Sequence, residues 1–375
     1  MKKNKNTRNL KIFLSIFISF WIFSGNVLLF ARAKNIIVMI GDGMGPAVIG
    51  LTKYYSRYVE ETPFLNIERV ADDSSIAILY TLSGSNLVTD SAAAATSLFC
   101  GIKTVNGRVG VDENNKPAEN VLEKAQLLGK SVGIVTTTDV TDATPAGFSV
   151  HTLSRQNKQK IANQQIEKKI NIIFGGGRNN FNIQKAKGLG YNVVFSREEL
   201  LKIDSKNSDF VLGLFSELDL SFAGRRKKQE PSLMEMTKTA LEILSKNKDG
   251  FLLLIEGGRI DHACHENNPE NLIKDMIEFD QTVGVVKDFI ETKKIKEETL
   301  LLITADHDTG GVALGKINGE YATVDDLKEL KGIFWASKDH TACPVILIGT
   351  GPGSDKIKGF KDNTFIYELI SSAIQ

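Results

Sequence analysis

The sequence predicts an α/β protein with a central, mostly parallel β-sheet and helices on both faces. Short unbroken apolar runs, typical of strands buried on both faces, lie at residues 35–40, 132–136, 251–255, 300–304 and 345–348. Segments of helical period lie between them, and one such segment places Leu272, Met276, Phe279, Val283 and Val286 three or four residues apart. Because strands alternate with helices, we expect parallel strands that are covered by helices on each side.

The composition is that of an ordinary globular protein. The 375 residues are 42% hydrophobic and 24% charged, which allows a large core, and the net charge of +1 gives no basic face for nucleic acid. The densest basic cluster, residues 225–228, is expected to be a solvated loop. Three cysteines, Cys100, Cys264 and Cys343, exclude a framework of several disulfides.

The first 33 residues have the pattern of a secretory signal. Basic residues precede an apolar stretch at 12–30, and Ala31, Arg32 and Ala33 form a small-x-small cleavage pattern, so the mature chain would start near Lys34. An uncleaved membrane anchor is the alternative, because the apolar stretch is long. The interruption at residues 24–26 favours cleavage and no stable membrane insertion. Either reading places the chain outside the cytoplasm, in the periplasm or at the cell exterior.

Acidic residues follow the apolar runs in chain order. Asp42 follows the first run, Asp139 and Asp142 the second, Glu256 the third and Asp306 the fourth. Carboxyl ends of parallel strands meet at one edge of a sheet, where ligand sites collect. A single Asp is more often a turn residue that faces water. Several acids gathered together would repel one another unless a cation lay among them, so the set predicts a metal cluster.

Histidines sharpen the metal prediction. The chain has five, and four of them lie beside the acids already named: His262, His265, His307 and His340. Mixed imidazole and carboxylate ligands suit zinc. Asp261 and His265 are four residues apart, so one helical turn would direct both at the same ion.

The stretch at residues 88–96 supplies a candidate nucleophile, Ser91. Thr89 or Asp90 is a good N-cap, and the alanines at 92–95 favour a helix, so Ser91 is expected in the first helical turn. Free backbone N–H groups and the helix dipole favour an anion such as phosphate there. Taken alone, the stretch favours an ordinary capped helix that packs through small residues, because Ser and Asp at helix starts are common for stability reasons.

Two further segments carry weaker signals. Residues 174–178 contain three glycines after an expected strand at 171–174, and without a following Lys-Ser/Thr pair we interpret them as a structural turn and not a phosphate cradle. Residues 308–339 separate two of the metal motifs, so an excursion over the site is expected there.

Six motifs, in this order, resemble those of alkaline phosphatases, the secreted metal-dependent phosphomonoesterases. They are GDGMG (41–45), VTDSAAAAT (88–96), DATPAGFSVHTLSR (142–155), EGGRIDHACH (256–265), TADHD (304–308) and DHTA (339–342). The resemblance extends from about residue 35 to about residue 353, and it implies one catalytic domain over residues 34–375.

The resemblance implies two zinc ions, one magnesium ion and a site residue set. One zinc would be bound by Asp261, His265 and His340, the other by Asp42, Asp306 and His307, and magnesium by Asp42, Thr144 and Glu256 with Asp142 beside it. Ser91 would form a phosphoseryl intermediate that water hydrolyses, and Arg155, oriented by Asp90, would bind two phosphate oxygens. Small-molecule phosphate monoesters would be the substrates, with broad specificity for the alcohol, and a homodimer is expected from the family.

The chain departs from the family at three positions. Asp142 and His262 lie at two positions where family members vary, and this chain combines them as a mixed pair. His262 is expected to contact phosphate through water. Thr309 lies where several members have another histidine. A serine needs a base or a metal to become a nucleophile. A metal is favoured here because four histidines already have proposed roles at the metal site and the fifth, His151, lies in a stretch interpreted as helix.

Two questions remain open at this stage. The alternative functions are a phosphodiesterase or phosphomutase with the same metal core, and a secreted metal- or anion-binding protein without turnover. Cys264 and Cys343, each close to a proposed ligand of one zinc, are expected to be neighbours as buried thiols, with a disulfide or zinc ligation less favoured.

Overall fold

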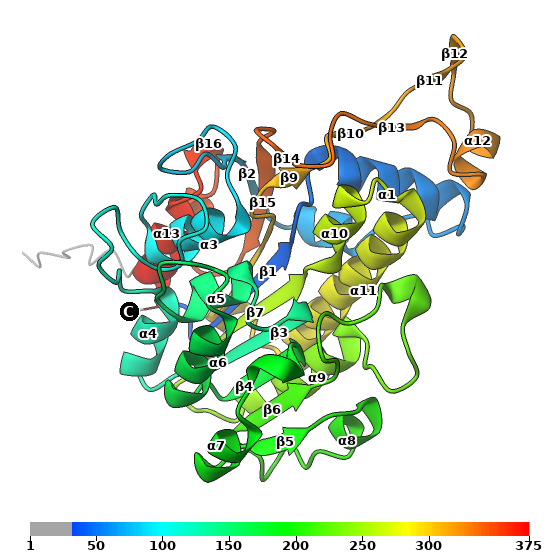
Figure 1. The fold of residues 1–375 in the computed structure, drawn as a ribbon. Helices are drawn as coiled ribbons and strands as arrows, with labels where there is room; N and C mark the ends of the chain where they lie inside the picture. Colours follow the sequence, from blue (N-terminus) through cyan, green and yellow to red (C-terminus); the bar gives the residue numbers. More distant parts are fainter. Residues whose placement is uncertain (1–31, 375) are drawn as a thin grey trace, which may run out of the picture.

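The computed structural model describes residues 32–374, so residues 1–31 of the expected signal at 1–33 lie outside the described part. Within the described part, one sheet of ten strands organises the molecule (Figure 1). In spatial order the strands are β16 (Gly359–Asp362), β2 (Ser75–Tyr80), β15 (Val345–Thr350), β8 (Thr299–Thr304), β1 (Asn35–Gly41), β7 (Phe251–Gly257), β3 (Ser131–Asp139), β4 (Ile172–Gly176), β6 (Val211–Leu214) and β5 (Asn192–Val194).

The centre of the sheet is parallel, as predicted. Strand β1 lies between β7 and β8 in parallel register, with Ile36 opposite Leu252 on one side and Leu300 on the other. Every residue of these three strands is buried, which explains their unbroken apolar composition.

Two strand predictions were wrong in detail. Strand β15 was expected to be parallel but runs antiparallel to β8 and β2, because the chain leaves β8 and returns to β15 at the same edge of the sheet. Strand β3 was expected to end at Thr136 but continues to Asp139, with a register shift after Val135 where polar residues replace apolar ones.

Helices pack on both faces of the sheet (Figure 1). The helices of the described residues are α1 (Pro46–Tyr58), α2 (Asn66–Ala71), α3 (Ser91–Cys100), α4 (Val121–Leu127), α5 (Ala143–Ser149), α6 (Lys158–Glu167), α7 (Ile183–Gly188), α8 (Arg197–Leu201), α9 (Leu233–Leu244), α10 (Arg259–His265), α11 (Pro269–Lys293), α12 (Val324–Lys328) and α13 (Phe365–Ala373), of which α12 lies away from the sheet. Helices α9 and α11 pack together against β3 and β7, whereas α3, α4, α5 and α13 form the other layer. The predicted helical stripe at residues 272–286 lies on α11, with its five apolar residues buried.

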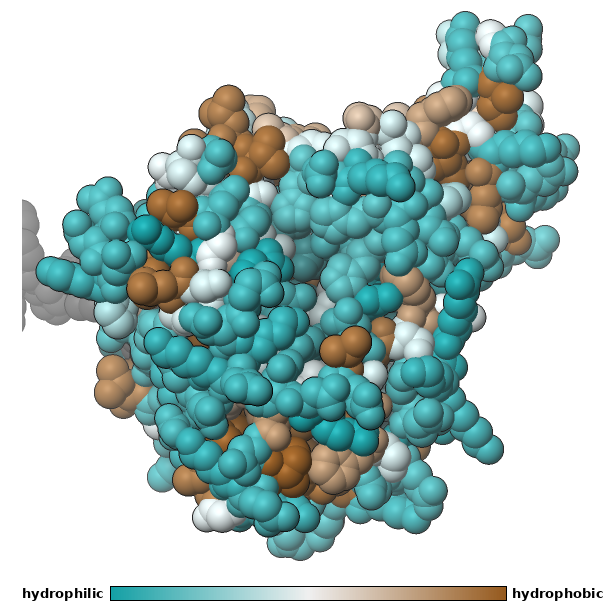
Figure 2. All heavy atoms as spheres, in the orientation of Figure 1, coloured by the Kyte–Doolittle hydropathy of each residue, from teal (hydrophilic) through white to brown (hydrophobic). Residues whose placement is uncertain are grey.

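The expected excursion begins and ends on a small antiparallel pair. Strand β9 (Asp308–Thr309) pairs with β14 (His340–Thr341), which brings His340 opposite Thr309. Between them, β10 (Val312–Leu314), β11 (Lys316–Ile317), β12 (Glu320–Tyr321), α12 and β13 (Ile333–Trp335) project from the body beside α1 (Figure 1). Figure 2 shows that hydrophilic residues cover most of this face, with hydrophobic residues on the projecting segment and in separate patches.

The glycine-rich turn after β4 is structural, as predicted. A side chain at Gly176 would meet the Leu218 carbonyl oxygen at 1.8 Å, and Arg178 donates to the carbonyls of Leu214 and Phe195. The basic cluster at residues 225–228 is only partly solvated, because Arg226 is nearly buried in an ion pair with Glu278. Among the described residues, no helix combines the length and apolar character needed to cross a membrane.

Candidate metal and phosphate site

The carboxyl ends of the central strands bring the acidic residues to one edge of the sheet. Asp42 directly follows β1, Glu256 is the penultimate residue of β7, and Asp306 follows β8 by two residues. In the described residues two sets of three side chains place ligand atoms within 4.8 Å of one another. Asp42, Asp306 and His307 form one set, here the inner group, and Asp261, His265 and His340 form the other, the outer group.

The inner group is buried. The side chains of Asp306 and His307 are fully buried, and His307 Nε2 lies 3.0 Å from Asp306 Oδ2 and 3.6 Å from Asp42 Oδ1. The other Asp306 oxygen, Oδ1, accepts hydrogen bonds from the backbone N–H groups of Gly43 and His307. One oxygen of each aspartate is therefore directed at His307 while the backbone fixes the Asp306 carboxylate.

The electrostatics of the inner group call for a cation. Burial, followed by the charges of Asp306, Asp261 and Glu256, raises the pKa of Asp42 well above its usual value. Asp42 Oδ1 and Asp306 Oδ2 are buried without a hydrogen-bond partner among residues 32–374. A buried carboxylate oxygen without a hydrogen-bond partner costs free energy of folding. These two oxygens are therefore positioned as ligands for a cation.

The outer group is open to solvent on one side. His265, at the end of α10, is 36% exposed in its side chain, and its Nε2 lies 3.2 Å from Asp261 Oδ2. The Nε2 atom of His340, on β14, lies 3.6 Å from Asp261 Oδ1 and 3.2 Å from His265 Nε2. As expected from their spacing, Asp261 and His265 lie one helical turn apart on the same side of α10.

Charge is balanced differently in the outer group. The hydrogen bond that His265 donates to the Asp261 carboxylate raises the pKa of His265 to about 9. Burial, together with the neighbouring His307, lowers the pKa of His340 to about 4. Burial would raise the pKa of Asp261, but hydrogen bonding to His265 and the nearby imidazoles outweigh it and hold that pKa well below its usual range.

Glu256 lies in a third polar cluster beside the inner group. Its Oε2 accepts hydrogen bonds from the hydroxyls of Thr136 and Thr138, and burial is the main reason that its pKa is raised to about 8. Thr144 Oγ1, on α5, is buried without a hydrogen-bond partner in the described part of the chain. Thr136 and Thr138 were not identified from the sequence, although three threonines in succession at the end of an apolar strand are a readable signal.

Ser91 is the first residue of α3, as predicted from its cap and alanines. Asp90 is the N-cap, and its Oδ1 accepts from the Ala93 N–H at 3.0 Å. Ser91 Oγ lies 3.0 Å from His307 Nε2 of the inner group. The hydroxyl is therefore at a helix N-terminus and next to the candidate metal ligands at once.

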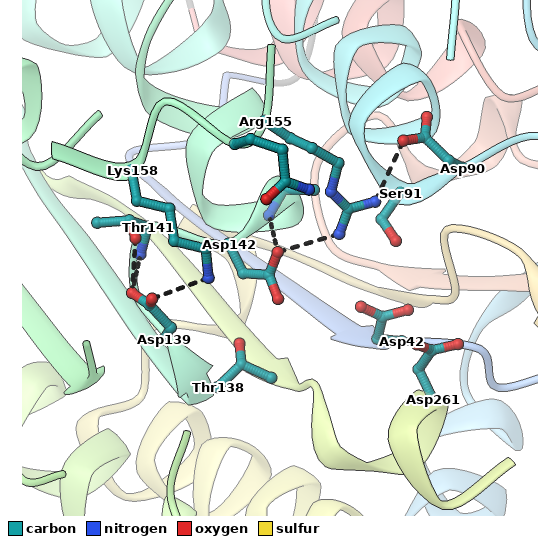
Figure 3. A network of polar contacts seen from close by, with 12 residues as sticks. Asp42, Asp90, Ser91, Thr138, Asp139, Thr141, Asp142, Arg155, Lys158 and Asp261 are labelled. Atoms are coloured by element: carbon teal, nitrogen blue, oxygen red, sulfur yellow. Dashed lines mark hydrogen bonds and ion pairs between the residues drawn. The ribbon is translucent and has the colours of Figure 1, made fainter. Parts of the chain in front are cut away.

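Arg155 is held between two carboxylates near Ser91 (Figure 3). Its Nη1 donates to Asp90 Oδ2 at 3.1 Å and its Nη2 donates to Asp142 Oδ1 at 3.0 Å. Burial lowers the pKa of Arg155, but Asp142 and Asp90 outweigh it and keep the pKa above its usual value. A permanently charged guanidinium that is fixed on both nitrogens is suited to binding two oxygens of one phosphate.

Asp142 and His262, the expected mixed pair, have different polar partners in the structure. Asp142 pairs with Arg155, whereas His262 Nδ1 lies 2.5 Å from Arg259 Nη1 and 3.6 Å from Asp219 Oδ2. Asp219 belongs to a loop without a recognisable motif, and it also accepts from the backbone N–H of Asp139. Arg259 and Asp219 are therefore polar partners of His262, and its contact with phosphate through water stays a prediction.

Two smaller expectations also need correction. Helix α5 ends at Ser149, so His151 lies beyond the helix, where its ring contacts the Gly110 carbonyl and Glu123. Cys264 is buried as expected, but Cys343 is exposed, and the three cysteines are free thiols in the described structure. Burial, the main cause, raises the pKa of Cys264 well above its usual value.

Comparisons with known proteins identify the family of this chain. The family model described as "Alkaline phosphatase" matches residues 33–329. Alkaline phosphatase 3 of Bacillus subtilis is 40% identical over 298 residues, which cover 75% of this chain and 62% of that protein. The repressible alkaline phosphatase of Saccharomyces cerevisiae is 36% identical over 322 residues, 76% of this chain and 56% of that protein. The matched part thus spans less than two thirds of either relative.

A solved structure agrees with both the fold and the family. A mutant of the TAB5 alkaline phosphatase, described with magnesium bound in a site called M3, superposes with a TM-score of 0.79 and 28% identity over 92% of this chain and 98% of that one. With the family model and the relatives, this likeness shows that the chain belongs to the alkaline phosphatase family.

Proposed function

We propose that this chain hydrolyses phosphate monoesters to an alcohol and inorganic phosphate, with Ser91 as the nucleophile. The observation that carries the proposal is the position of the Ser91 hydroxyl, at the N-terminus of α3 and 3.0 Å from His307 in the inner group. A serine hydroxyl needs activation to attack phosphorus, and a metal centre at His307 would provide it.

The donor sets fit three metal ions. The inner and outer groups combine imidazole with carboxylate, which suits zinc, whereas Asp42, Thr144 and Glu256 offer oxygens alone, which suits magnesium. The unpaired oxygens of Asp42, Asp306 and Thr144 in the described structure are the direct support for this assignment. When bound, the zinc ions lower the pKa of the attacking hydroxyl or water and stabilise the charge that develops on the phosphoryl oxygens.

The residues of the chain divide the reaction into two steps. Ser91 attacks phosphorus and the alcohol leaves, which gives a phosphoseryl intermediate. Water then attacks that phosphorus and releases inorganic phosphate and the free serine. Arg155, fixed by Asp90 and Asp142, binds two phosphoryl oxygens in both steps, and the N–H groups at the start of α3 add partial positive charge.

The proposed substrates are small phosphate monoesters with varied alcohols. The groups assigned here act on the phosphoryl group, so they recognise its charge and oxygens and not the alcohol. A phosphodiester carries an additional ester group in place of one anionic oxygen, which Arg155 and the metal groups would bind less well. The proposal therefore favours monoesters over diesters.

An aryl phosphate assay tests the proposal. The purified chain in zinc- and magnesium-replete buffer at alkaline pH should release phosphate, and Ser91→Ala or a chelator should abolish the release. Mass spectrometry of enzyme quenched in acid during turnover should find phosphate on Ser91. A wild-type chain that releases no phosphate when fully supplied with metal would support a binding protein without turnover.

Secretion and assembly complete the proposal. We propose that residues 1–33 are a cleaved secretory signal and that the mature chain acts in the periplasm or outside the cell, in line with the basic and apolar pattern of the first 33 residues. Intact mass of the exported protein tests the cleavage, and light scattering tests the homodimer expected for the family.

A further inference from the structure

The three histidines of the inner and outer groups share one orientation. Each turns Nε2 toward the carboxylates of its group and places Nδ1 beside an oxygen. For His265 that oxygen is the Lys338 carbonyl, and for His340 it is the Thr89 carbonyl, 2.8 Å away. Because a carbonyl oxygen only accepts, Nδ1 carries a proton in both rings, so Nε2 is the ring nitrogen left to bind a metal ion.

His307 is held by a side chain instead of the backbone. Its Nδ1 lies 3.2 Å from the hydroxyl oxygen of Thr309, a residue that is fully buried. The same hydroxyl donates to Asp261 Oδ1 at 2.5 Å. A hydroxyl has one proton, so once Thr309 donates it to Asp261, only its lone pairs can face His307.

The single proton of the Thr309 hydroxyl determines how both His307 and Asp261 are held. His307 must carry its proton on Nδ1, which leaves the Nε2 lone pair directed at Asp42, Asp306 and the Ser91 hydroxyl. Asp261 has Oδ1 held by Thr309 and Oδ2 directed at His265. Thr309 therefore contacts one residue of the inner group and one of the outer group.

The backbone holds Thr309 in this position. Its N–H donates to the Gly43 carbonyl at 3.3 Å, and β9 pairs it with His340 on β14. Gly43 has a φ of 70°, and a side chain there would lie 2.8 Å from Thr309 Oγ1 and 2.9 Å from Asp261 Oδ1. The turn after β1 thus packs directly against the hydroxyl.

We propose that Thr309 is a positioning residue that links the two metal groups, so that one hydroxyl sets the affinity of both zinc sites. It selects the His307 tautomer in the inner group and orients the Asp261 carboxylate in the outer group. The proposal rests on the proposed function, because it concerns the same two zinc sites. The hydroxyl itself touches neither substrate nor reacting atoms.

Zinc affinity, measured apart from activity, tests the link. Metal-free wild type, Thr309→Val and Thr309→Ser are titrated with zinc against a chromophoric chelator. Valine keeps the shape and removes the hydroxyl, so both zinc equivalents should bind roughly 10- to 100-fold more weakly. Serine keeps the hydroxyl, so Thr309→Ser should stay within about threefold of wild type.

Thr341→Val is the matched control. Thr341 lies on the same β9–β14 pair, but its hydroxyl donates to Asp308, which belongs to neither group. Zinc affinities of this variant should match wild type. Thermal unfolding of the metal-free proteins checks folding, and Thr309→Ala replaces the valine variant if the latter does not fold.

The outcomes are distinct. Wild-type affinity at both sites in Thr309→Val, or weakening of only one zinc equivalent, overturns the link. A wild-type chain that binds two zinc ions but hydrolyses no phosphate ester refutes the proposed function. The effect of the Thr309 variants on zinc affinity can still be interpreted in that case. A wild-type chain that binds no zinc overturns both proposals.

Discussion

The inner and outer groups use similar residues in opposite surroundings. The inner group has two carboxylates and one imidazole in a buried pocket, with Asp42 and Asp306 oxygens left unpaired in the described structure. The outer group has one carboxylate and two imidazoles, and the His265 side chain is 36% exposed. Burial raises the pKa of Asp42, whereas the histidines lower that of Asp261.

In the proposed reaction, this difference would separate the two chemical steps. The inner group contacts Ser91 and excludes solvent, so it is placed to activate the hydroxyl for attack on the substrate. The outer group is reached by water, so it is placed to serve the attack of water on the phosphoserine. Similar ligands thus acquire different roles through burial and charge, and four predictions test that contrast.

The largest expected effect distinguishes the groups by the intermediate that accumulates. Asp306→Asn removes an inner carboxylate and should lower turnover by roughly 10³-fold, since metal stabilisation of the transition state contributes several kcal/mol. No phosphoserine should form. His265→Ala affects the outer group, so Ser91 should still react while hydrolysis slows, and phosphoserine should build up.

Rapid quench with labelled substrate measures the intermediate directly. Ser91→Ala, which has no acceptor, is the blank for both variants. Equal amounts of phosphoserine in Asp306→Asn and His265→Ala would show that the groups do not divide the steps as proposed.

Arg155 belongs to neither group and should affect binding more than either chemical step. Arg155→Lys keeps the charge but cannot hold Asp90, Asp142 and two phosphate oxygens together, so KM and the inhibition constant for inorganic phosphate should rise about 10- to 100-fold. Steady-state kinetics measures both constants. Arg178→Lys, at the structural turn after β4, is the control and should leave them unchanged.

Asp275 is a buried carboxylate outside both groups. It provides a comparison with the metal groups, because its titration should make the stability of the protein depend on pH. Burial and the neighbouring Glu278 raise its pKa to about 7, despite a hydrogen bond from the Ala223 N–H and the charges of Arg226 and Arg259. The native state therefore binds this proton more tightly than the unfolded chain, so stability is lost as the pH rises from about 4 through 7.

Asp275→Asn should remove that loss. Its melting temperature should exceed that of wild type by a few degrees at pH 8 and by much less at pH 4.5, because asparagine does not ionise. Differential scanning calorimetry with and without zinc checks this, and the difference should not depend on the metal. An equal shift at both pH values would contradict the titration of Asp275.

The smallest expected effect concerns the thiols near the outer group. A thiol reagent should label Cys343, which is exposed, in the native protein and leave Cys100 and Cys264 unmodified until the chain unfolds. Labelling should change activity by less than about twofold. Rapid native labelling of Cys264, followed by mass spectrometry of its peptide, would contradict the burial described here.

The fold was predictable where one physical signal dominates. Unbroken apolar runs located the buried strands, and the cap and alanine run located α3. The direction of β15 was not predictable, because it depends on where the chain re-enters the sheet after the projecting segment. The polar extension of β3 was also missed, since Thr137 to Asp139 lack the apolar pattern that identifies a strand.

The site was predictable at the positions with chemically distinctive residues. Acids after strands, histidines beside acids and a serine at a helix start were readable, and the structure brings them together. The distant partners of His262 and Thr309 were not readable, because Asp219 lies on a separate loop from His262 and Asp261 lies 48 residues before Thr309. Contacts of that kind are set by tertiary packing.

Anomalous X-ray scattering from crystals of the zinc-loaded protein tests the central claim most directly. Data recorded above and below the zinc edge should show two zinc peaks, one among Asp42, Asp306 and His307 next to Ser91, and one among Asp261, His265 and His340. A single peak, or two peaks away from these residues, would contradict the proposed two-group site.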